Sequence, residues 1–120
     1  MIFFFNFLLV FQNAKIILST YDEISQIVKE KSCFVLAISS DSFNYYSIMS
    51  EFRAAARKSQ SLMDFYILLV NTLNKKQIQE LNCTTFPALI PYYIGKPSDK
   101  FYGPFSYGTI FQFINYHSTS

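Results

Sequence analysis

The sequence predicts an α/β domain in which a mixed central β-sheet is covered by helices on both faces. Two continuous apolar runs, residues 33–38 and 65–70, are typical of strands that are buried on both sides. Segments with helical spacing of apolar residues alternate with these runs, and two short apolar segments precede a final helix. Alternating strands and helices favour parallel pairing, and a terminal hairpin adds antiparallel strands.

The first strand and helix are expected at residues 15–18 and directly after Thr20. Thr20 and Glu23 form a T-x-x-E capping box, which marks the start of a helix. Apolar residues then recur at helical spacing as far as Val28. The run 33–38 follows, and we expect it at the centre of the sheet.

A long helix is expected after the central strand, with Asp41 or Ser42 as its N-cap. The strand at 65–70 comes next, and Asn74 caps a short helix whose inward residues are Ile78 and Leu81. The long helix buries one apolar stripe, formed by Tyr45, Ile48, Met49, Phe52, Ala55 and Ala56.

The last third of the chain predicts two strands and a helix. One strand covers residues 88–94 with an irregularity at Pro91, where the missing N–H breaks the ladder. A turn at residues 95–97 leads to a last strand at 100–102. The final helix turns four residues to the core: Tyr107, Ile110, Phe111 and Ile114.

Composition limits the classes of function. A chain of 120 residues is one domain, and a hydrophobic share of 51% gives it ample apolar surface for a core. The net charge of +2 is too small for the basic stripe that nucleic-acid binding requires. Arg53, Arg57 and Lys58 form only a short cluster, which indicates a solvated helix end. We therefore expect no nucleic-acid partner.

Residues 1–14 are interpreted as a signal peptide. The segment carries no charged side chain, its apolar run is about ten residues long, and Ala14 supplies a small residue before a cleavage point. A bilayer-spanning helix needs about 20 residues. An N-terminal strand or a retained anchor is the alternative. A signal peptide implies that the protein enters the secretory pathway and resides in the endoplasmic reticulum lumen or outside the cell. The domain at 15–120 is then expected to have no stable membrane span.

The order of elements, together with two short motifs, resembles the thioredoxin fold and in particular the single domains of the protein disulfide isomerase family. The resemblance covers about residues 15–117. Ser42-Phe43-Asn44-Tyr45 falls where that family has C-x-x-C, directly after the central strand. Phe86-Pro87 falls where the family has a cis-proline, so the resemblance implies a cis Pro87 that faces Ser42 across a shallow groove. Phe101-Tyr102-Gly103 resembles the family's closing Y-x-G pattern.

The residues that serve redox chemistry in this family have no counterparts here. A dithiol oxidoreductase needs a low-pKa thiolate at the helix N-terminus and a second thiol one turn on, but these positions hold Ser42 and Tyr45. By the same resemblance, Asp41 replaces a tryptophan, Leu36 a buried carboxylate and Phe105 an arginine.

The two cysteines of the chain are expected to be free. The resemblance places Cys33 and Cys83 at opposite ends of the sheet, beyond the ~7 Å between Cα atoms that a disulfide allows. Cys83 acting as a lone thiol near Ser42 is the alternative.

Other chemistry-bearing residues are few. Asn82 begins an N-x-[ST] sequon, a possible glycosylation site if the chain is secreted. His117, the only histidine, is expected on the helix surface. No spacing of ligands predicts a metal site, and no cofactor is expected.

Two functions follow. The first is a redox-inactive domain that binds extended or unfolded polypeptide, in a chaperone-like or adaptor role. The second is a divergent thiol-disulfide oxidoreductase. For Tyr45 and Tyr46, the alternative to a role in binding is that they simply pack in the fold. The proposed peptide-binding surface consists of Phe43, Tyr45, Tyr46, Phe86 and Pro87.

Overall fold

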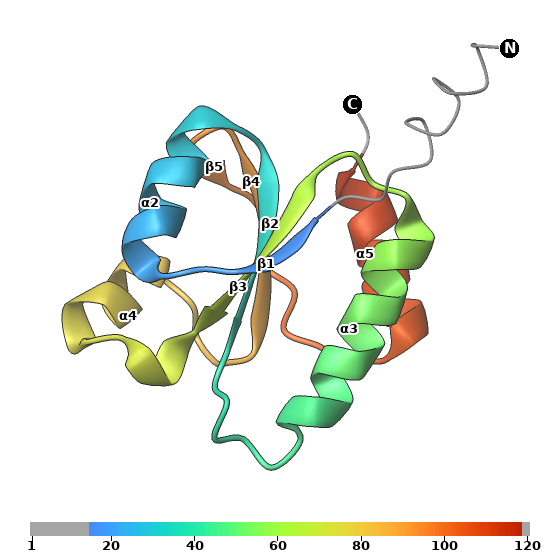
Figure 1. Cartoon of the computed structure of the whole chain (residues 1–120), viewed down its shortest axis with the longest axis horizontal. Helices are drawn as coiled ribbons and strands as arrows, with labels where there is room; N and C mark the ends of the chain where they lie inside the picture. Colours follow the sequence, from blue (N-terminus) through green and yellow to red (C-terminus); the bar gives the residue numbers. More distant parts are fainter. Residues whose placement is uncertain (1–14, 119–120) are drawn as a thin grey trace, which may run out of the picture.

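A computed structural model of the chain, which describes residues 15–118, confirms the predicted α/β class (Figure 1). Strands and α-helices alternate as far as the third α-helix, and a hairpin and a last helix follow. The elements are β1 (Ile16–Leu18), α2 (Tyr21–Glu30), β2 (Cys33–Ile38), α3 (Tyr45–Ser59), β3 (Asp64–Leu69), the 3-10 turn η1 (Val70–Thr72), α4 (Lys75–Leu81), β4 (Ala88–Tyr93), β5 (Lys96–Pro97) and α5 (Tyr107–His117).

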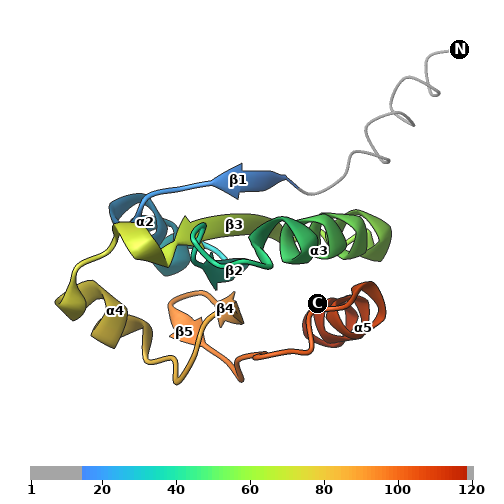
Figure 2. The ribbon, with the colours of Figure 1, turned by 90° about the horizontal axis from the view of Figure 1, so that it is seen from below.

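The five strands form one mixed sheet in the order β1-β3-β2-β4-β5. The first three strands in that order are parallel, and β4 and β5 are antiparallel to their neighbours. Helices α2 and α4 cover one face and α3 and α5 cover the other, as Figure 2 shows from below. This three-layer arrangement is the one that the sequence predicted.

Strand β2 is the centre of the fold, as predicted, and all six of its residues are buried. Phe34, Leu36 and Ile38 point to the layer of α3 and α5. Their neighbours along the strand belong to the cluster on the opposite face, under α2 and α4. The ring of Phe34 stacks on that of Phe65 in β3, with centroids 5.1 Å apart.

The two short capping boxes position α2 and α4. Thr20 Oγ1 accepts the Glu23 N–H at 3.2 Å, and the Glu23 carboxylate accepts the Thr20 N–H at 2.8 Å, which confirms the predicted box. Asn74 and Gln77 make the same reciprocal pair at the start of α4. Each box satisfies amide groups that a helix start leaves without partners.

The start of α3 corrects the prediction. The helix begins at Tyr45, with Asn44 as its N-cap, and neither Asp41 nor Ser42 caps it. Residues 39–44 form turns instead, in which the Ser42 N–H donates to the Ser39 carbonyl and the Ser42 carbonyl accepts the Tyr45 N–H. Local turn bonds therefore replace one helical turn.

Strand β4 corrects the predicted irregularity at Pro91. The strand pairs with β2 without interruption, and Pro91 lies opposite Phe34. The Pro91 carbonyl accepts the Ser98 N–H at 2.8 Å, so the backbone groups of this residue face away from β2. The missing N–H of Pro91 therefore removes no hydrogen bond between β2 and β4.

The last strand was also placed wrongly. The hairpin closes through Ile94 and Gly95, both at positive φ, and β5 covers only Lys96–Pro97. Phe101 makes an isolated bridge to Leu89, in which each N–H donates to the other residue's carbonyl at 2.9 Å. A two-residue turn with positive φ brings β5 close, and no strand forms at 100–102.

Two side chains of α5 differ from the prediction. Tyr107 is exposed and stacks on Phe111 with centroids 6.0 Å apart, so it does not face the core. His117 is 7% exposed, not at the surface. The hydroxyl oxygen of Tyr93 lies 2.7 Å from His117 Nδ1 and donates to the His117 carbonyl at 2.9 Å. The histidine thus joins the end of α5 to β4.

We expect the stability of the domain to fall as the pH falls through the histidine range. Burial lowers the pKa of His117, and Asp99 acts weakly in the opposite direction. A lowered folded-state pKa means that the unfolded chain binds the proton first, so the stabilisation is present above about pH 6.5 and is lost below it. Because His117 is the only histidine, His117→Gln should remove this dependence. Thermal unfolding from about pH 7.5 to about pH 5.5 measures it, and a melting temperature that rises on acidification contradicts it.

Candidate functional site

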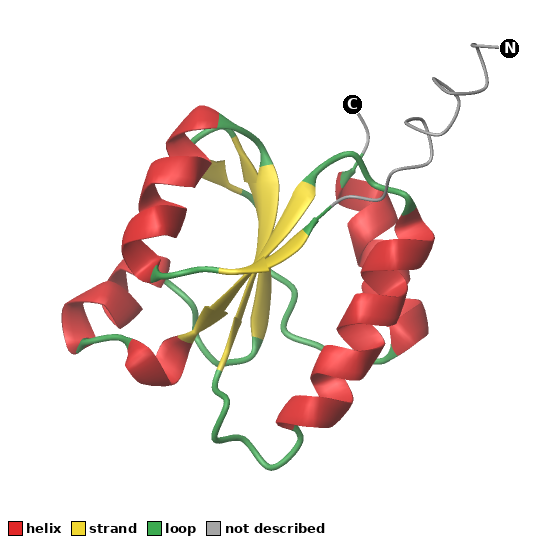
Figure 3. Ribbon diagram, in the orientation of Figure 1, coloured by secondary structure: helices red, strands yellow, loops and turns green. Residues whose placement is uncertain are grey.

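The candidate site lies where β2 ends and β4 begins. Ala37 pairs with Ala88, and Ile38 pairs with Leu69 of the parallel neighbour β3. The loop that enters α3 and the loop that precedes β4 therefore leave the sheet at the same end, the lower end in Figure 3. This is the edge at which the sequence placed its candidate residues.

Asn71 holds the first of these loops. Its side-chain oxygen accepts the Ser40 N–H at 3.1 Å, and its amide nitrogen donates to the Ser40 hydroxyl at 3.0 Å. This reciprocal pair ties the loop to η1 after β3. This pair could not be predicted, because nothing in the local sequence links residues that are 31 positions apart.

The aromatic residues around the start of α3 separate into exposed and packed side chains. Phe43 is 100% exposed and Tyr46 is 83% exposed. Tyr45 is half-buried and packs against the core under α3 and α5. Its ring meets that of Tyr46 edge-on, with centroids 5.0 Å apart. The alternative that both tyrosines pack therefore holds for Tyr45 and fails for Tyr46.

Pro87 follows a cis peptide bond, as predicted. Both Phe86 and Pro87 are half-buried, and Phe86 packs against the core under α2 and α4. Tyr45 packs on the opposite face of the sheet, so these two predicted site residues do not form one continuous surface. The groove between Ser42 and Pro87 stays a prediction.

Tyr102 supports this loop through a hydrogen bond. The Tyr102 hydroxyl accepts the Thr84 N–H at 3.2 Å, three residues before Pro87. The peptide bond between Gly103 and Pro104 is also cis, which the sequence analysis did not predict. The only sequence feature close to this bond is the Phe101-Tyr102-Gly103 pattern, which Pro104 directly follows.

Both cysteines are free, as predicted. Cys33 lies buried at the start of β2, opposite Tyr92 and therefore at the far end from Ala88. Burial raises the pKa of Cys33 to about 11. Burial also raises the pKa of the half-buried Cys83, against smaller opposite effects of Lys100 and Tyr102. Neither thiol has the depressed pKa of a nucleophilic cysteine.

The positions that serve proton transfer in thiol chemistry are apolar here. Leu36 is fully buried in β2. Phe105 is half-buried and meets the ring of Phe101 edge-on, with centroids 5.2 Å apart. Leu36 and Phe105 both belong to the packing around α3 and α5. These two side chains can pack but cannot carry a proton.

Asn82 ends α4 in the left-handed conformation, with φ 55°. Asn82 is exposed, and its backbone N–H donates to the Gln79 carbonyl. Asn82, the first residue of the sequon, thus lies on an exposed turn directly before the half-buried Cys83.

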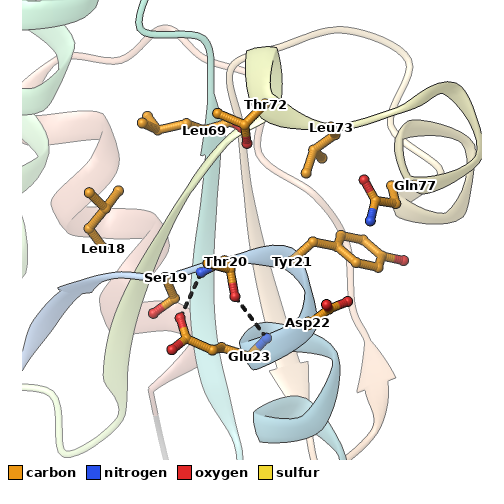
Figure 4. A pocket seen from close by; sticks show the side chains of 10 residues that line it. All are labelled: Leu18, Ser19, Thr20, Tyr21, Asp22, Glu23, Leu69, Thr72, Leu73 and Gln77. Atoms are coloured by element: carbon orange, nitrogen blue, oxygen red, sulfur yellow. Dashed lines mark hydrogen bonds between the residues drawn. The ribbon is translucent and has the colours of Figure 1, made fainter.

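A hollow of about 470 Å³ lies at the N-terminus of α2, and none of the predicted site residues lines it. Figure 4 shows Leu18 on one side, Leu69, Thr72 and Leu73 above, and the Thr20–Glu23 capping box below. This hollow could not be predicted from the sequence, because its walls come from β1, α2, β3, η1 and α4, which only the fold brings together.

Residues 15–118 contain no group of three or more His, Cys, Asp or Glu side chains that could hold a metal ion. Among the same residues, no helix has the length and apolar character needed to cross a membrane. The segment interpreted as a signal peptide lies outside the described residues.

The chain has the thioredoxin-like fold, which solved structures confirm. The J-Trx1 fragment of ERdj5 matches with a TM-score of 0.74 and 18% identity, over 88% of this chain and 52% of the fragment. This chain therefore spans about half the length of that structure. Malassezia sympodialis thioredoxin matches with a TM-score of 0.72 and 17% identity, over 90% of this chain and 97% of that one.

The zinc-bound form of human ERp44 has the same fold over part of its length. The match has a TM-score of 0.72 and 13% identity, and it covers 88% of this chain and 32% of ERp44. No family model and no curated protein matches the chain. At these identities the likeness establishes the fold and leaves the function to the site.

Proposed function

We propose that this chain is a redox-inactive thioredoxin-like domain of the secretory pathway that binds extended or unfolded polypeptide. The observation that carries the proposal is the replacement of C-x-x-C by Ser42-Phe43-Asn44-Tyr45 in a domain that retains the thioredoxin-like fold. The scaffold is kept while the thiols are missing.

The geometry around Ser42 supports the absence of redox chemistry. A serine hydroxyl is not a thiolate at physiological pH, and Ser42 lies in a turn before α3 rather than at the helix N-cap. The dipole of the helix acts within its first turn, so it would stabilise an anion at Ser42 only weakly. With Leu36 and Phe105 in place of proton-transfer groups, this site lacks both the nucleophile and its partners.

Exposed aromatic rings support polypeptide binding. Large apolar side chains at the surface add contact area when an unfolded segment covers them. Phe43 and Tyr46 are such side chains, and they flank the start of α3. Pro87 ends the neighbouring loop at the same end of the sheet, where backbone groups can pair with an extended chain. We place the client contact on Phe43 and Tyr46, with Tyr45 packed against Tyr46, and we propose Phe86 and Pro87 as a separate contact at the same end of the sheet.

A divergent thiol-disulfide oxidoreductase that works through Cys83 is the second candidate. Cys83 precedes the Pro87 loop, and Lys100 and Tyr102 act to lower its pKa. Burial outweighs both effects, and Sγ donates weakly to the Leu81 carbonyl at 3.6 Å. The likeness to thioredoxins favours this candidate no more than the first, because it reports the fold.

We expect the full chain to reduce insulin disulfides no faster than dithiothreitol alone, because no thiol stands at residues 42–45. Cys83→Ala should leave this background rate unchanged. The double substitution Ser42→Cys and Tyr45→Cys should give only weak activity, since Ser42 precedes the helix and proton-transfer groups are missing. Turnover by the native chain that Cys83→Ala abolishes would establish the second candidate instead.

We expect Phe43→Ser to weaken binding of an unfolded polypeptide, such as reduced and carboxymethylated α-lactalbumin, by about tenfold, the effect of losing part of a buried phenyl ring. Leu62→Ser is the matched control, because Leu62 is 95% exposed. It follows the far end of α3, about 22 Å from the helix start. Fluorescence anisotropy of the labelled client measures both. Equal affinities of the two variants argue against the surface.

We expect protein from a eukaryotic secretory host to begin at or near Lys15 and to carry a glycan on Asn82. The uncharged apolar segment 1–14 motivates the first expectation, and the exposed turn at Asn82 the second. Intact-mass measurement before and after peptide-N-glycosidase treatment identifies the N-terminal residue and the presence of the glycan. Asn82→Gln is the control for the glycan. A membrane-bound product that retains Met1 would show that the segment is an anchor.

A further inference from the structure

We propose that the outer edge of β1 accepts an extended segment of another polypeptide as an added strand, and that this segment combines apolar with basic side chains. The proposal goes beyond the function above and uses a different surface. It depends on the backbone of β1, the groove beside it and the charges at its rim.

The backbone of β1 offers free pairing groups on one side. Lys15 accepts the Phe65 N–H at 2.8 Å and Ser19 donates to the Ile67 carbonyl at 3.0 Å, so odd-numbered residues of this segment face β3. Alternation along a strand turns the N–H and C=O groups of Ile16 and Leu18 outward. In the part of the chain described, β3 is the only strand that pairs with β1.

A groove of about 600 Å³ runs beside this edge. Ile17 and Leu18 of β1, Tyr66 of β3 and Ile27 of α2 line it. Leu18 is 63% exposed and Ile17 is 36% exposed. In Figure 2, β1 lies at the outer edge of the sheet, above β3. A strand added to β1 would bring alternate side chains over Ile17 and into this groove.

The rim of the groove is acidic. Asp22 and Glu23 line it, and the same two residues line the hollow of Figure 4. No lysine or arginine lines either one. Two cations lie in the neighbourhood: Lys15 directly precedes β1, and Lys31 lies 5.5 Å from the centroid of the Tyr66 ring and is paired with Asp64 at 2.8 Å. A lysine or arginine beside the apolar residues of the partner would complement this rim.

Charge also distinguishes this partner from two other occupants. Residues 1–14 carry no basic side chain, so they match the floor of the groove but not its rim. A second copy of the chain would bring its own Asp22 and Glu23 to the shared edge, where like charges repel. An extended basic and apolar segment fits both features.

Substitutions at Leu18 test the backbone pairing in the full chain. The probe is a fluorescein-labelled peptide, Ser-Lys-Val-Ile-Val-Lys-Ser, and its Glu-for-Lys counterpart is the charge control. Leu18→Pro removes an N–H that faces away from β3, so the β1–β3 ladder stays intact. Leu18→Ala removes the side chain alone. We expect Leu18→Pro to bind the Lys peptide about tenfold more weakly than Leu18→Ala, the effect of one lost hydrogen bond with its partner unpaired.

Substitutions on α2 test the charge. Asp22→Lys should weaken binding of the Lys peptide and strengthen binding of the Glu peptide. Glu30→Lys is the matched control, because it makes the same charge change on the same helix without lining the groove. Phe43→Ser should leave this binding unchanged, so a failure here is distinguishable from a failure of the surface at the start of α3.

Amide hydrogen exchange gives a direct readout. With the Lys peptide at saturation, the amides of Ile16 and Leu18 should gain protection, while Ile17, already bonded toward β3, should change little. Protection at Ile16 and Leu18 before any peptide is added would mean that residues 1–14 or a second copy cover the edge, and it would overturn the proposal. Equal affinity of Leu18→Pro and Leu18→Ala would overturn it as well.

Discussion

The burial of β2 on both faces is the constraint on which the rest of the structure depends. A strand with six buried residues must have a helical layer on each side and a strand on each edge. Its apolar side chains alternate between the two layers, so the register of β2 fixes the positions of α2, α3, α4 and α5 together. A one-residue slip would exchange the two sets of side chains and disrupt both cores at once.

The same strand determines where chemistry can occur. Strand β2 runs parallel to β3 and antiparallel to β4. The residues after Ile38 and those before Ala88 therefore lie at the same end of the sheet, although they are far apart in the sequence. In a redox enzyme this edge would hold thiols. Here Asn71 holds the loop, aromatic side chains lie at the surface, and Ser42 and Tyr45 stand where the resemblance places the two thiols. That combination supports the polypeptide binding that we propose.

The parts of the fold that depend on local patterns were predictable. The capping boxes at Thr20 and Asn74 need residues three apart, and the run 33–38 needs only its own composition. The start of α3 was not predictable, because turn bonds around Ser42 compete with helical bonds of similar strength. His117 was misplaced because its burial depends on Tyr93, which lies 24 positions away.

The candidate site was predictable to a similar extent. A short motif identified Pro87, and its cis bond is present. That Phe86 and Tyr45 pack on opposite faces follows from how the loops cross the sheet edge, which no spacing in the sequence encodes. The groove beside β1 depends on the packing of α2 against two strands. Its residues are ordinary in sequence, since exposed Leu18 and acidic Asp22 occur in many surface segments.

Asp64 lies at the start of β3, at the end of the strands opposite the candidate site. Burial alone would raise the pKa of Asp64, but the bond from the Lys31 ammonium at 2.8 Å and that from the Lys15 N–H at 3.0 Å lower it. Cleavage after Ala14 would turn this amide into a terminal ammonium, and the bond to Asp64 would become charge-assisted. Maturation of the chain would then itself strengthen the folded domain, and the carboxylate would act as a receptor for the newly made end.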